Sequence, residues 1–376
     1  MVFPDAGRGA ALADHRRHAP AARAGRRRDC ASGGRTSERA ASLRRRVEES
    51  LLSMGRTVSV VLVTWNDAPF LRRCLKGIEQ QTHEDIEFIH VDNASDDDSA
   101  AIVRAQFPAG RQILNEENRG FAGAVNQAIH LSRGELILLC NPDAYLERDY
   151  IARILEAFDA AGDEFGMATG KLFRARGYEI EPTELIDSKG IRMTRSGRHF
   201  DIGQGLPDSA PARGLKPLRT AIEVFGVSGA AAVYRRSFID AVSIDGEFFD
   251  EDFFTYREDA DVAWRGRLFG WRGMVVPDAI AYHVRKVTPK GRRSLSAAVN
   301  MHSVKNRFLL RLKNEGLYLA LRNAIFEIPR DIVTIAAVLT IERTSLPALK
   351  WLLGNWRRVL QKRRLISDRA LAEWFR

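Results

Sequence analysis

VSVVLVT at residues 58–64 opens the stretch of sequence that decides the fold. After it, amphipathic segments alternate with short, almost continuous apolar runs. Such runs between helical segments are typical of buried parallel strands joined by crossover helices. The sequence therefore predicts an α/β doubly wound sheet, which binds its ligand at the carboxyl ends of the strands. The segments that follow are PFLRRCLKGIEQ (69–80), IEFIHVD (86–92), SAAIVRAQF (99–107), QILN (112–115), FAGAVNQAIHL (121–131) and ELILLCN (135–141).

The length and composition describe a globular protein. With 376 residues and 45% hydrophobic content, the chain can bury the core of one large or two modest domains. Its three cysteines, Cys30, Cys74 and Cys140, form no CxxC pair, which favours a reducing compartment. No apolar run reaches the roughly 18 residues of a spanning helix, and the first residues lack the apolar core of a secretory signal. We expect a cytoplasmic protein, with a peripheral position on the inner face of the cytoplasmic membrane as a further hypothesis.

Charge divides the chain into three parts. Residues 1–53 hold 12 arginines and 6 acids, residues 54–286 hold 28 basic and 36 acidic residues, and residues 287–376 hold 18 basic and 6 acidic residues. An acidic body argues against nucleic acid as a partner. The basic tail either contacts an anionic membrane, through Lys305, Arg307, Arg311, Lys313 and the cluster at 357–364, or is simply solvated.

These compositional changes also suggest domain boundaries. Residues 1–53 are rich in Ala, Arg and Gly, and we expect them to form a disordered basic extension. Residues 54–288 are expected to form the α/β domain, and residues 289–376 a basic helical tail at a membrane surface. Within the α/β domain, the Gly- and Arg-rich segment DSKGIRMTRSGRHFDIGQG (187–205) predicts a hairpin or a lid.

Polar side chains stand at the ends of two of the predicted strands. Thr64 and Asn66 follow the first strand, and Asp92 and Asn93 follow the second. Such residues can hydrogen-bond a nucleotide, but each loop alone is equally typical of turn and capping chemistry. Arg119, before a predicted helix, suggests an anion site at the N–H groups of that helix, or else a solvated side chain on a capped helix.

Three carboxylates and one histidine are candidates for the chemistry. Asp143, in the turn Asn141-Pro142-Asp143, could bind a hard cation, although an ordinary Asn-Pro turn is the plainer interpretation. Glu258 and Asp259 stand at a helix start, where they either cap the helix or provide a general base. His283 ends an apolar stretch; a lone histidine there is more often structural, but imidazole is a competent ligand for Mn2+ beside a carboxylate.

Taken together and in this order, six strings resemble glycosyltransferase family 2, the inverting enzymes with the GT-A fold. The strings are VSVVLVTWN (58–66), VDNASDD (91–97), NRGFAGAVNQAI (118–129), NPD (141–143), REDADVAWRGRLFGW (257–271) and PDAIAYH (277–283). The resemblance implies a Rossmann-like nucleotide-diphospho-sugar transferase domain with a mixed, mostly parallel sheet, followed by the basic helices. It is strongest to bacterial rhamnosyltransferases and galactofuranosyltransferases that extend cell-surface glycans.

The resemblance also implies roles for individual residues. The residues that would line the nucleotide sugar are Thr64, Asn66, Asp92, Asn93, Arg119, Asn141 and Asp143. Asn141 stands where many members have an aspartate, so the metal site would carry one charge less. Asp143 and His283 would be the ligands of Mg2+ or Mn2+. Asp259, next to Glu258, would be the base.

The implied activity is the transfer of one sugar with inversion. The donor is expected to be a nucleoside-diphosphate sugar, with dTDP-rhamnose as the first hypothesis and a galactofuranosyl or other hexosyl donor as the alternative. The acceptor is expected to be a glycan or a polyprenyl-linked hydroxyl. A nucleotidylyltransferase is disfavoured, because the loop TWNDAPF (64–70) lacks glycine. A catalytically silent nucleotide-sugar-binding protein stays an alternative.

Overall fold

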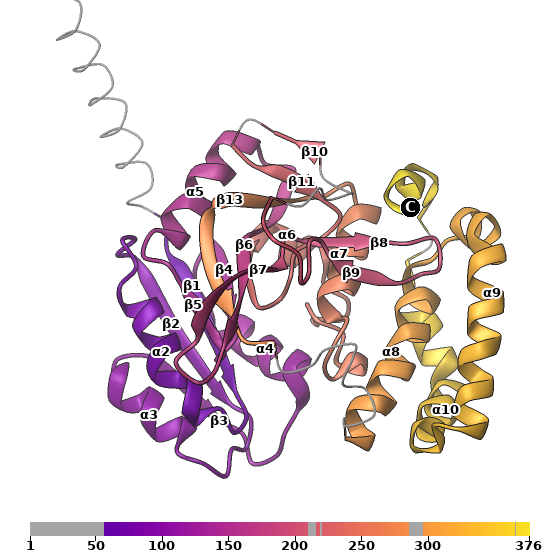
Figure 1. The fold of residues 1–376 in the computed structure, drawn as a ribbon, viewed down its shortest axis with the longest axis horizontal. Helices are drawn as coiled ribbons and strands as arrows, with labels where there is room; N and C mark the ends of the chain where they lie inside the picture. The colour runs from indigo at the N-terminus through magenta and orange to yellow at the C-terminus, as the bar shows by residue number, and fades with distance from the viewer. Residues whose placement is uncertain (1–55, 210–215, 219, 286–295, 365) are drawn as a thin grey trace, which may run out of the picture. The chain divides into compact units, whose positions relative to one another are not determined.

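The computed structural model describes residues 56–209, 216–218, 220–285, 296–364 and 366–376, all within one compact unit. Its central feature is an 11-stranded sheet, in which neighbouring strands run in the order β10-β11-β13-β6-β12-β4-β1-β2-β3, with β5 paired to β13 and β7 to β6 (Figure 1). The expected extension at residues 1–53 lies outside the described residues. The strands are β1 (Val58–Thr64), β2 (Ile86–Asp92), β3 (Arg111–Leu114), β4 (Leu136–Cys140), β5 (Ala144–Leu146), β6 (Phe165–Arg176), β7 (Glu181–Ser188), β10 (Lys216–Pro217), β11 (Ile222–Val224), β12 (Ala231–Arg235) and β13 (Arg272–His283).

The first half of the sheet has the parallel topology expected from the sequence. Strand β1 pairs in parallel with β2 and with β4, and β2 pairs in parallel with β3. All seven residues of β1 are buried, because successive side chains point to opposite faces and both faces carry helices. Val61 and Val63 pack with residues of one face, while Val60 and Leu62 pack with residues of the other.

Helices cover this sheet and continue past its last strand. On the first half they are α2 (Ala68–Glu79), α3 (Ser99–Gln106) and α4 (Gly120–Leu131), while α5 (Tyr150–Ala161) packs against β6 and β13. On the second half they are α6 (Arg236–Val242), η1 (Glu251–Phe253) and α7 (Glu258–Leu268). The expected C-terminal helical region is confirmed as α8 (Ala297–Asn314), α9 (Leu317–Thr340), η3 (Arg343–Ser345), α10 (Leu346–Gln361) and η4 (Arg369–Trp374).

The second half of the sheet is mixed. Strand β12 runs antiparallel between β4 and β6, and β13 runs parallel to β6 but antiparallel to β5. The hairpin predicted within residues 187–205 is present as a separate two-stranded sheet of β8 (Ile191–Met193) and β9 (His199–Asp201). In Figure 1 this hairpin reaches from the sheet toward α9.

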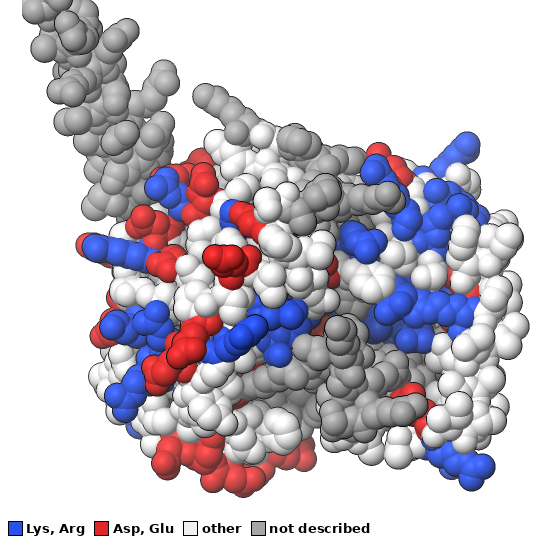
Figure 2. All heavy atoms as spheres, viewed as in Figure 1, with Lys and Arg blue, Asp and Glu red and all other residues white. Residues whose placement is uncertain are grey.

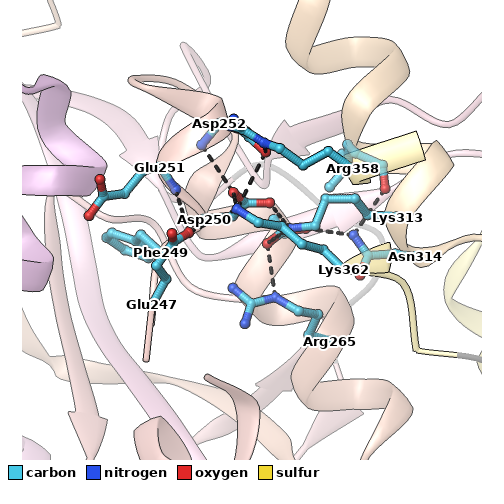
Figure 3. A network of polar contacts seen from close by, with 12 residues as sticks. Glu247, Phe249, Asp250, Glu251, Asp252, Arg265, Lys313, Asn314, Arg358 and Lys362 are labelled. Carbon is cyan, nitrogen blue, oxygen red and sulfur yellow. Dashed lines mark hydrogen bonds and ion pairs between the residues drawn. The ribbon is translucent and has the colours of Figure 1, made fainter. Parts of the chain in front are cut away.

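Several basic residues of the C-terminal helices point into the molecule. Lys313 of α8 is 2% exposed; its Nζ forms ion pairs with Asp250 and, at 3.1 Å, with Asp261 (Figure 3). Lys362 binds Asp250 at 2.6 Å, and Arg358 forms an ion pair with Asp252.

For these residues internal pairing takes the place of simple solvation, whereas contact of the basic tail with an anionic membrane stays a prediction. Arg311 also pairs internally, with Glu327 and Asp331, and Lys305 donates to the backbone of Asp252. Much of the excess charge therefore neutralises acids of the body.

None of the helices in the described part of the chain is long and apolar enough to cross a membrane. The proposed boundary between residues 288 and 289 lies in a segment outside the described residues, so the domain division stays a prediction.

Candidate active site

The ends of β1 and β2 place the first predicted site residues side by side. Thr64 and Asp92 are partners in the parallel register, and the Thr64 hydroxyl donates to Asp92 Oδ1 at 2.8 Å. The other carboxylate oxygen of Asp92 accepts from the Ser95 backbone N–H at 2.9 Å. Thr64 also contacts His90, whose pKa burial lowers to about 4, so the ring is neutral near pH 7. This end of the sheet is a rigid, hydrogen-bonded platform with a buried carboxylate.

Asn66 and Asn93 fix the loops that follow these strands. Asn66 has a φ of 57°, a left-handed conformation that Asn tolerates, and its side chain accepts from the Asp96 backbone N–H at 2.8 Å. Asn93 is buried and binds Asn118 Oδ1 through its Nδ2. The turn chemistry that the sequence left open is therefore present, and contact with a nucleotide stays a prediction for these residues.

The start of α4 differs from the expected anion site. The backbone N–H of Arg119 donates to Asn93 Oδ1 at 3.0 Å, and that of Ala122 donates to the Phe254 carbonyl at 3.1 Å. Gly120 has a φ of 75° and lies so close to Phe254 that a Cβ would be 2.5 Å from its carbonyl oxygen. These two N–H groups are used within the protein; the Arg119 side chain is exposed, and its contact with an anion stays a prediction.

Strand pairing between β5 and β13 brings the two predicted metal ligands together. His283 is the register partner of Ala144, the residue after Asp143, and His283 Nε2 lies 3.3 Å from Asp143 Oδ1. Asn141, half-buried at the end of β4, accepts from Ala144 through its backbone carbonyl at 3.1 Å. Residues that lie 140 positions apart in the sequence thus form one polar cluster.

A chain of ion pairs extends from His283. Its Nδ1 binds Asp187 Oδ2 at 2.8 Å, and Arg285 joins Asp187 at 2.8 Å to Asp201 at 2.7 Å. Burial alone would lower the pKa of His283, but Asp143 and Asp187 raise it to about 10. His283 and Arg285 hold the pKa of Asp187 well below its usual range despite its burial.

The donor chemistry of this cluster fits a divalent cation. Asp143 and His283 Nε2 lie together, and a cation bound between them would displace the Nε2 proton that the raised pKa of His283 retains. The Nδ1 N–H of His283 donates to Asp187, an arrangement typical of an imidazole that ligates a metal. No group of three or more His, Cys, Asp or Glu suited to a metal occurs in the part of the chain that the structure describes. With Asp143 and His283 as its protein ligands, the cation would have its remaining coordination positions filled by diphosphate oxygens and water.

The two acids at the start of α7 have different surroundings. Asp259 is half-buried; its Oδ2 accepts from the Gly229 backbone N–H at 3.3 Å and its Oδ1 from that of Ala260 at 2.7 Å. Burial and the charge of Asp201 raise the pKa of Asp259. Glu258 is 8% exposed, and burial together with Asp259 raises the pKa of Glu258 as well. Of the two, Asp259 is the more accessible carboxylate.

The loop before these acids is strained and is held by α8. Phe254, Tyr256 and Arg257 have φ values of 66°, 69° and 75°, which side chains larger than Gly or Asn rarely adopt. Asn306 of α8 is fully buried, and its Nδ2 lies 2.9, 2.8 and 2.8 Å from the carbonyl oxygens of Phe253, Thr255 and Tyr256. One side-chain amide therefore contacts three carbonyl groups of the loop that leads to Asp259.

The loop around Gly229 connects the two groups of predicted residues. The Gly229 N–H binds Asp259, while the carbonyl of the next residue, Ala230, accepts from the Asn141 backbone N–H at 2.9 Å. The structure adds four residues that sequence reasoning did not single out. Two of them, Asp187 and Asp201, could have been noticed as aspartates in a Gly-rich segment. The other two, Arg285 and Asn306, gave no signal that separates them from ordinary helix or strand residues.

Known proteins are similar to this chain over most of its described length. A comparison with protein families matches residues 59–242 to Glycosyl transferase family 2. EpsH of Bacillus subtilis is 27% identical over 272 residues, which cover 72% of this chain and 68% of EpsH. The N-acetylglucosaminyl-diphospho-decaprenol L-rhamnosyltransferase of Mycobacterium tuberculosis is 26% identical over 268 residues, 66% of this chain and 83% of that protein.

Solved structures confirm the fold. GalNAc-T7 with UDP, GalNAc and Mn2+ gives a TM-score of 0.53 at 14% identity, over 68% of this chain and 48% of that one. Residues 1–349 of S. aureus TarS give a TM-score of 0.50 at 16% identity, over 81% of both chains. The α/β GT-A architecture expected from the sequence is thus confirmed. Residues 59–242 thus match glycosyltransferase family 2, and the chain is a nucleotide-sugar-dependent glycosyltransferase.

Proposed function

We propose that the chain transfers a single sugar with inversion, using Asp259 as the general base. The observation that carries the proposal is the half-buried Asp259 carboxylate, held by Gly229 on the same loop that binds Asn141 beside the Asp143–His283 cluster. A carboxylate whose pKa is raised toward neutrality is suited to accept a proton from an attacking hydroxyl. Asp259 would take that proton as the hydroxyl oxygen bonds to the anomeric carbon and the nucleoside diphosphate leaves.

Asp143 and His283 would hold Mg2+ or Mn2+. The cation would supply charge neutralisation for the diphosphate. Asp187 would keep the His283 ring oriented through Nδ1, and the loops at Thr64, Asn66, Asp92 and Asn93, with Arg119, would position the nucleotide.

We infer a rhamnosyl donor and a polyprenyl-linked or glycan acceptor from the similarity to the M. tuberculosis rhamnosyltransferase. A galactofuranosyl or other hexosyl donor is the alternative. The test is thermal unfolding of the full chain with a panel of nucleotide sugars and Mg2+ or Mn2+, because a ligand that binds only the native state raises its stability. We expect dTDP-rhamnose to give the largest shift; a larger shift with another donor would replace this assignment.

Cation binding has its own test. Mn2+ should bind the wild-type chain, as measured by electron paramagnetic resonance, and bind on the order of 10- to 100-fold more weakly to Asp143→Asn. Asp149→Asn is the matched control, because Asp149 is exposed at the start of α5 and makes no side-chain cap. Removal of the cation by a chelator should abolish transfer. Full activity after exhaustive chelation, or equal Mn2+ binding by both variants, would refute the metal assignment.

A further inference from the structure

Helix α9 has the opposite amphipathicity to an ordinary surface helix. Its four charged residues all bind other parts of the protein. Glu327 and Asp331 pair with Arg311 of α8. Arg330 donates to the Ser196 carbonyl at 3.2 Å, in the β8–β9 hairpin, and Arg322 donates to the Phe375 carbonyl at 3.4 Å. The charged stripe of α9 is therefore the stripe that faces the protein.

The outward face of α9 is apolar along its whole length. Six apolar side chains, five of α9 and that of Ile341 just after it, are between 63% and 85% exposed, far above what a packed helix shows. Because many of them recur at intervals of three or four residues, they form one stripe, and a helix of 24 residues is about 36 Å long. A contiguous apolar surface of this size marks an interaction site. The most exposed members are Leu317, Leu321, Ile325, Ile332, Val333 and Ile341.

Basic residues border this stripe, and acidic residues are withdrawn from it. Arg369 lies over the ring of Tyr318 at the start of α9, and Arg343 is exposed just after its end. On α10, Lys350 and Arg357 are exposed as well. Among the described residues from 296 to the C-terminus, Glu373 is the only acid classed as exposed. Figure 2 shows the edge formed by α9 as white surface with blue surface beside it.

This combination fits an anionic lipid surface. Apolar side chains can enter the boundary between headgroups and acyl chains, while the basic border meets lipid phosphates. A second copy of the chain is a poorer fit, because a two-fold contact through α9 would bring basic borders of the same sign together. We propose that the outer face of α9 binds the protein to an anionic bilayer and lies in its surface. The binding is carried by apolar contact, not by the cluster of inward-pointing lysines and arginines.

The surface lies next to the catalytic loop through the β8–β9 hairpin. Arg195 of the hairpin donates to the Arg322 carbonyl of α9 at 3.0 Å, and His199 contacts Arg257 at 3.0 Å, two residues before Asp259. The β8–β9 hairpin thus links α9, which would contact the bilayer, to the loop that leads to Asp259. That position suits an acceptor whose sugar is attached to a membrane lipid. This last point rests on the proposed function, whereas bilayer binding itself depends on no catalytic residue.

The test is co-sedimentation of the full chain with vesicles of phosphatidylcholine alone or mixed with phosphatidylglycerol. We expect binding to the mixed vesicles that largely persists at about 0.5 M salt, where surface charges are screened within a few ångströms. The double variant Leu321→Glu/Ile325→Glu should lower the partition coefficient at least tenfold, since both side chains are exposed and their replacement leaves the core intact. Leu114→Glu is the control, because Leu114 is also an exposed apolar residue but lies on β3.

Three outcomes would overturn the proposal. The wild-type chain could fail to sediment with mixed vesicles, or the double variant could sediment like the wild type. Alternatively, analytical ultracentrifugation could show a dimer that the double variant dissociates, which would assign the face to a second copy. Asp259→Asn should bind vesicles normally, so loss of catalysis and loss of bilayer binding are separate results.

Discussion

The first half of the sheet and the C-terminal helices both carry many polar side chains, but they use them differently. In the first half, polar residues such as Thr64 and Asp92 come directly after buried strands and meet at one edge. In the C-terminal helices, Lys313 and Lys362 bind acids more than 50 and 110 residues away, at Asp261 and Asp250. In the first region, the local sequence pattern is therefore enough to locate a polar residue. In the second region, the direction of a polar side chain depends on a partner that is distant in sequence.

The largest effect on activity is expected from removing the Asp259 carboxylate. Asp259→Asn should lower turnover by about 10²- to 10⁴-fold, because the amide cannot accept the acceptor's proton. The measurement is release of nucleoside diphosphate in the presence of acceptor, with thermal unfolding as a check of the fold. Asp245→Asn is the control, since Asp245 is exposed in a turn with a φ of 53° that Asn also adopts. Near-normal turnover of a folded Asp259→Asn would show that the base lies elsewhere.

A second prediction tests whether the C-terminal helices are an integral part of the catalytic unit. Lys313→Met leaves Asp250 and Asp261 buried with one cation fewer, and we expect the free energy of unfolding to fall by about 3 kcal/mol. Lys350→Met is the matched control, exposed on α10, with an expected change within about 0.5 kcal/mol. Both are measured by denaturant unfolding. Equal stability of the two variants would mean that the helices form a separable tail, as their composition suggested.

The sequence predicted the first region well for a physical reason. Buried parallel strands are continuous apolar runs, and the carboxyl ends of such strands converge, so Val58 to Asn141 gives both the topology and the edge where Asn66, Asp92 and Asp143 lie. The pairing of Asp143 with His283 was beyond that argument, because it depends on strand β13 returning beside β5. Only the family resemblance suggested that these two residues meet.

The sequence was a poor guide to the second region. Lys305, Arg311 and Lys313 look like a solvated or membrane-bound cluster, because nothing local shows that acids of η1, α7 and α9 come to meet them. The role of Asn306 was equally hidden, since a helical asparagine gives no sign of the three carbonyls that it binds. Long-range partners, which composition cannot supply, determine this part of the molecule.

The clamp made by Asn306 gives the next prediction, with a smaller effect. Asn306→Ala removes the amide that holds Phe253, Thr255 and Tyr256, so the strained loop should relax and displace Asp259. We expect kcat to fall about tenfold, on the order of one net hydrogen bond, with little change in KM for the donor. Asn355→Ala removes a single helical contact on α10 and should leave kcat unchanged. If kcat is unaltered in Asn306→Ala while only thermal stability falls, Asn306 supports the fold without positioning the base.

The smallest effect concerns the pH profile and the link between the hairpin and the base. Burial and the negative charge of Asp201 raise the pKa of Asp259 to about 6, so a base that must be deprotonated loses activity as the pH falls through about 6. Asp201→Asn removes one cause of that elevation, and the acid limb of kcat/KM should move to lower pH by on the order of half a unit to one unit. Asp208→Asn makes the same charge change where the carboxylate pairs with Lys171 and Lys189, and should leave the limb in place. Neutralising an acid near a general base favours the deprotonated form of the base. If the acid limb of Asp201→Asn stays in place or moves to higher pH, Asp201 does not act on the base and the limb belongs to another group.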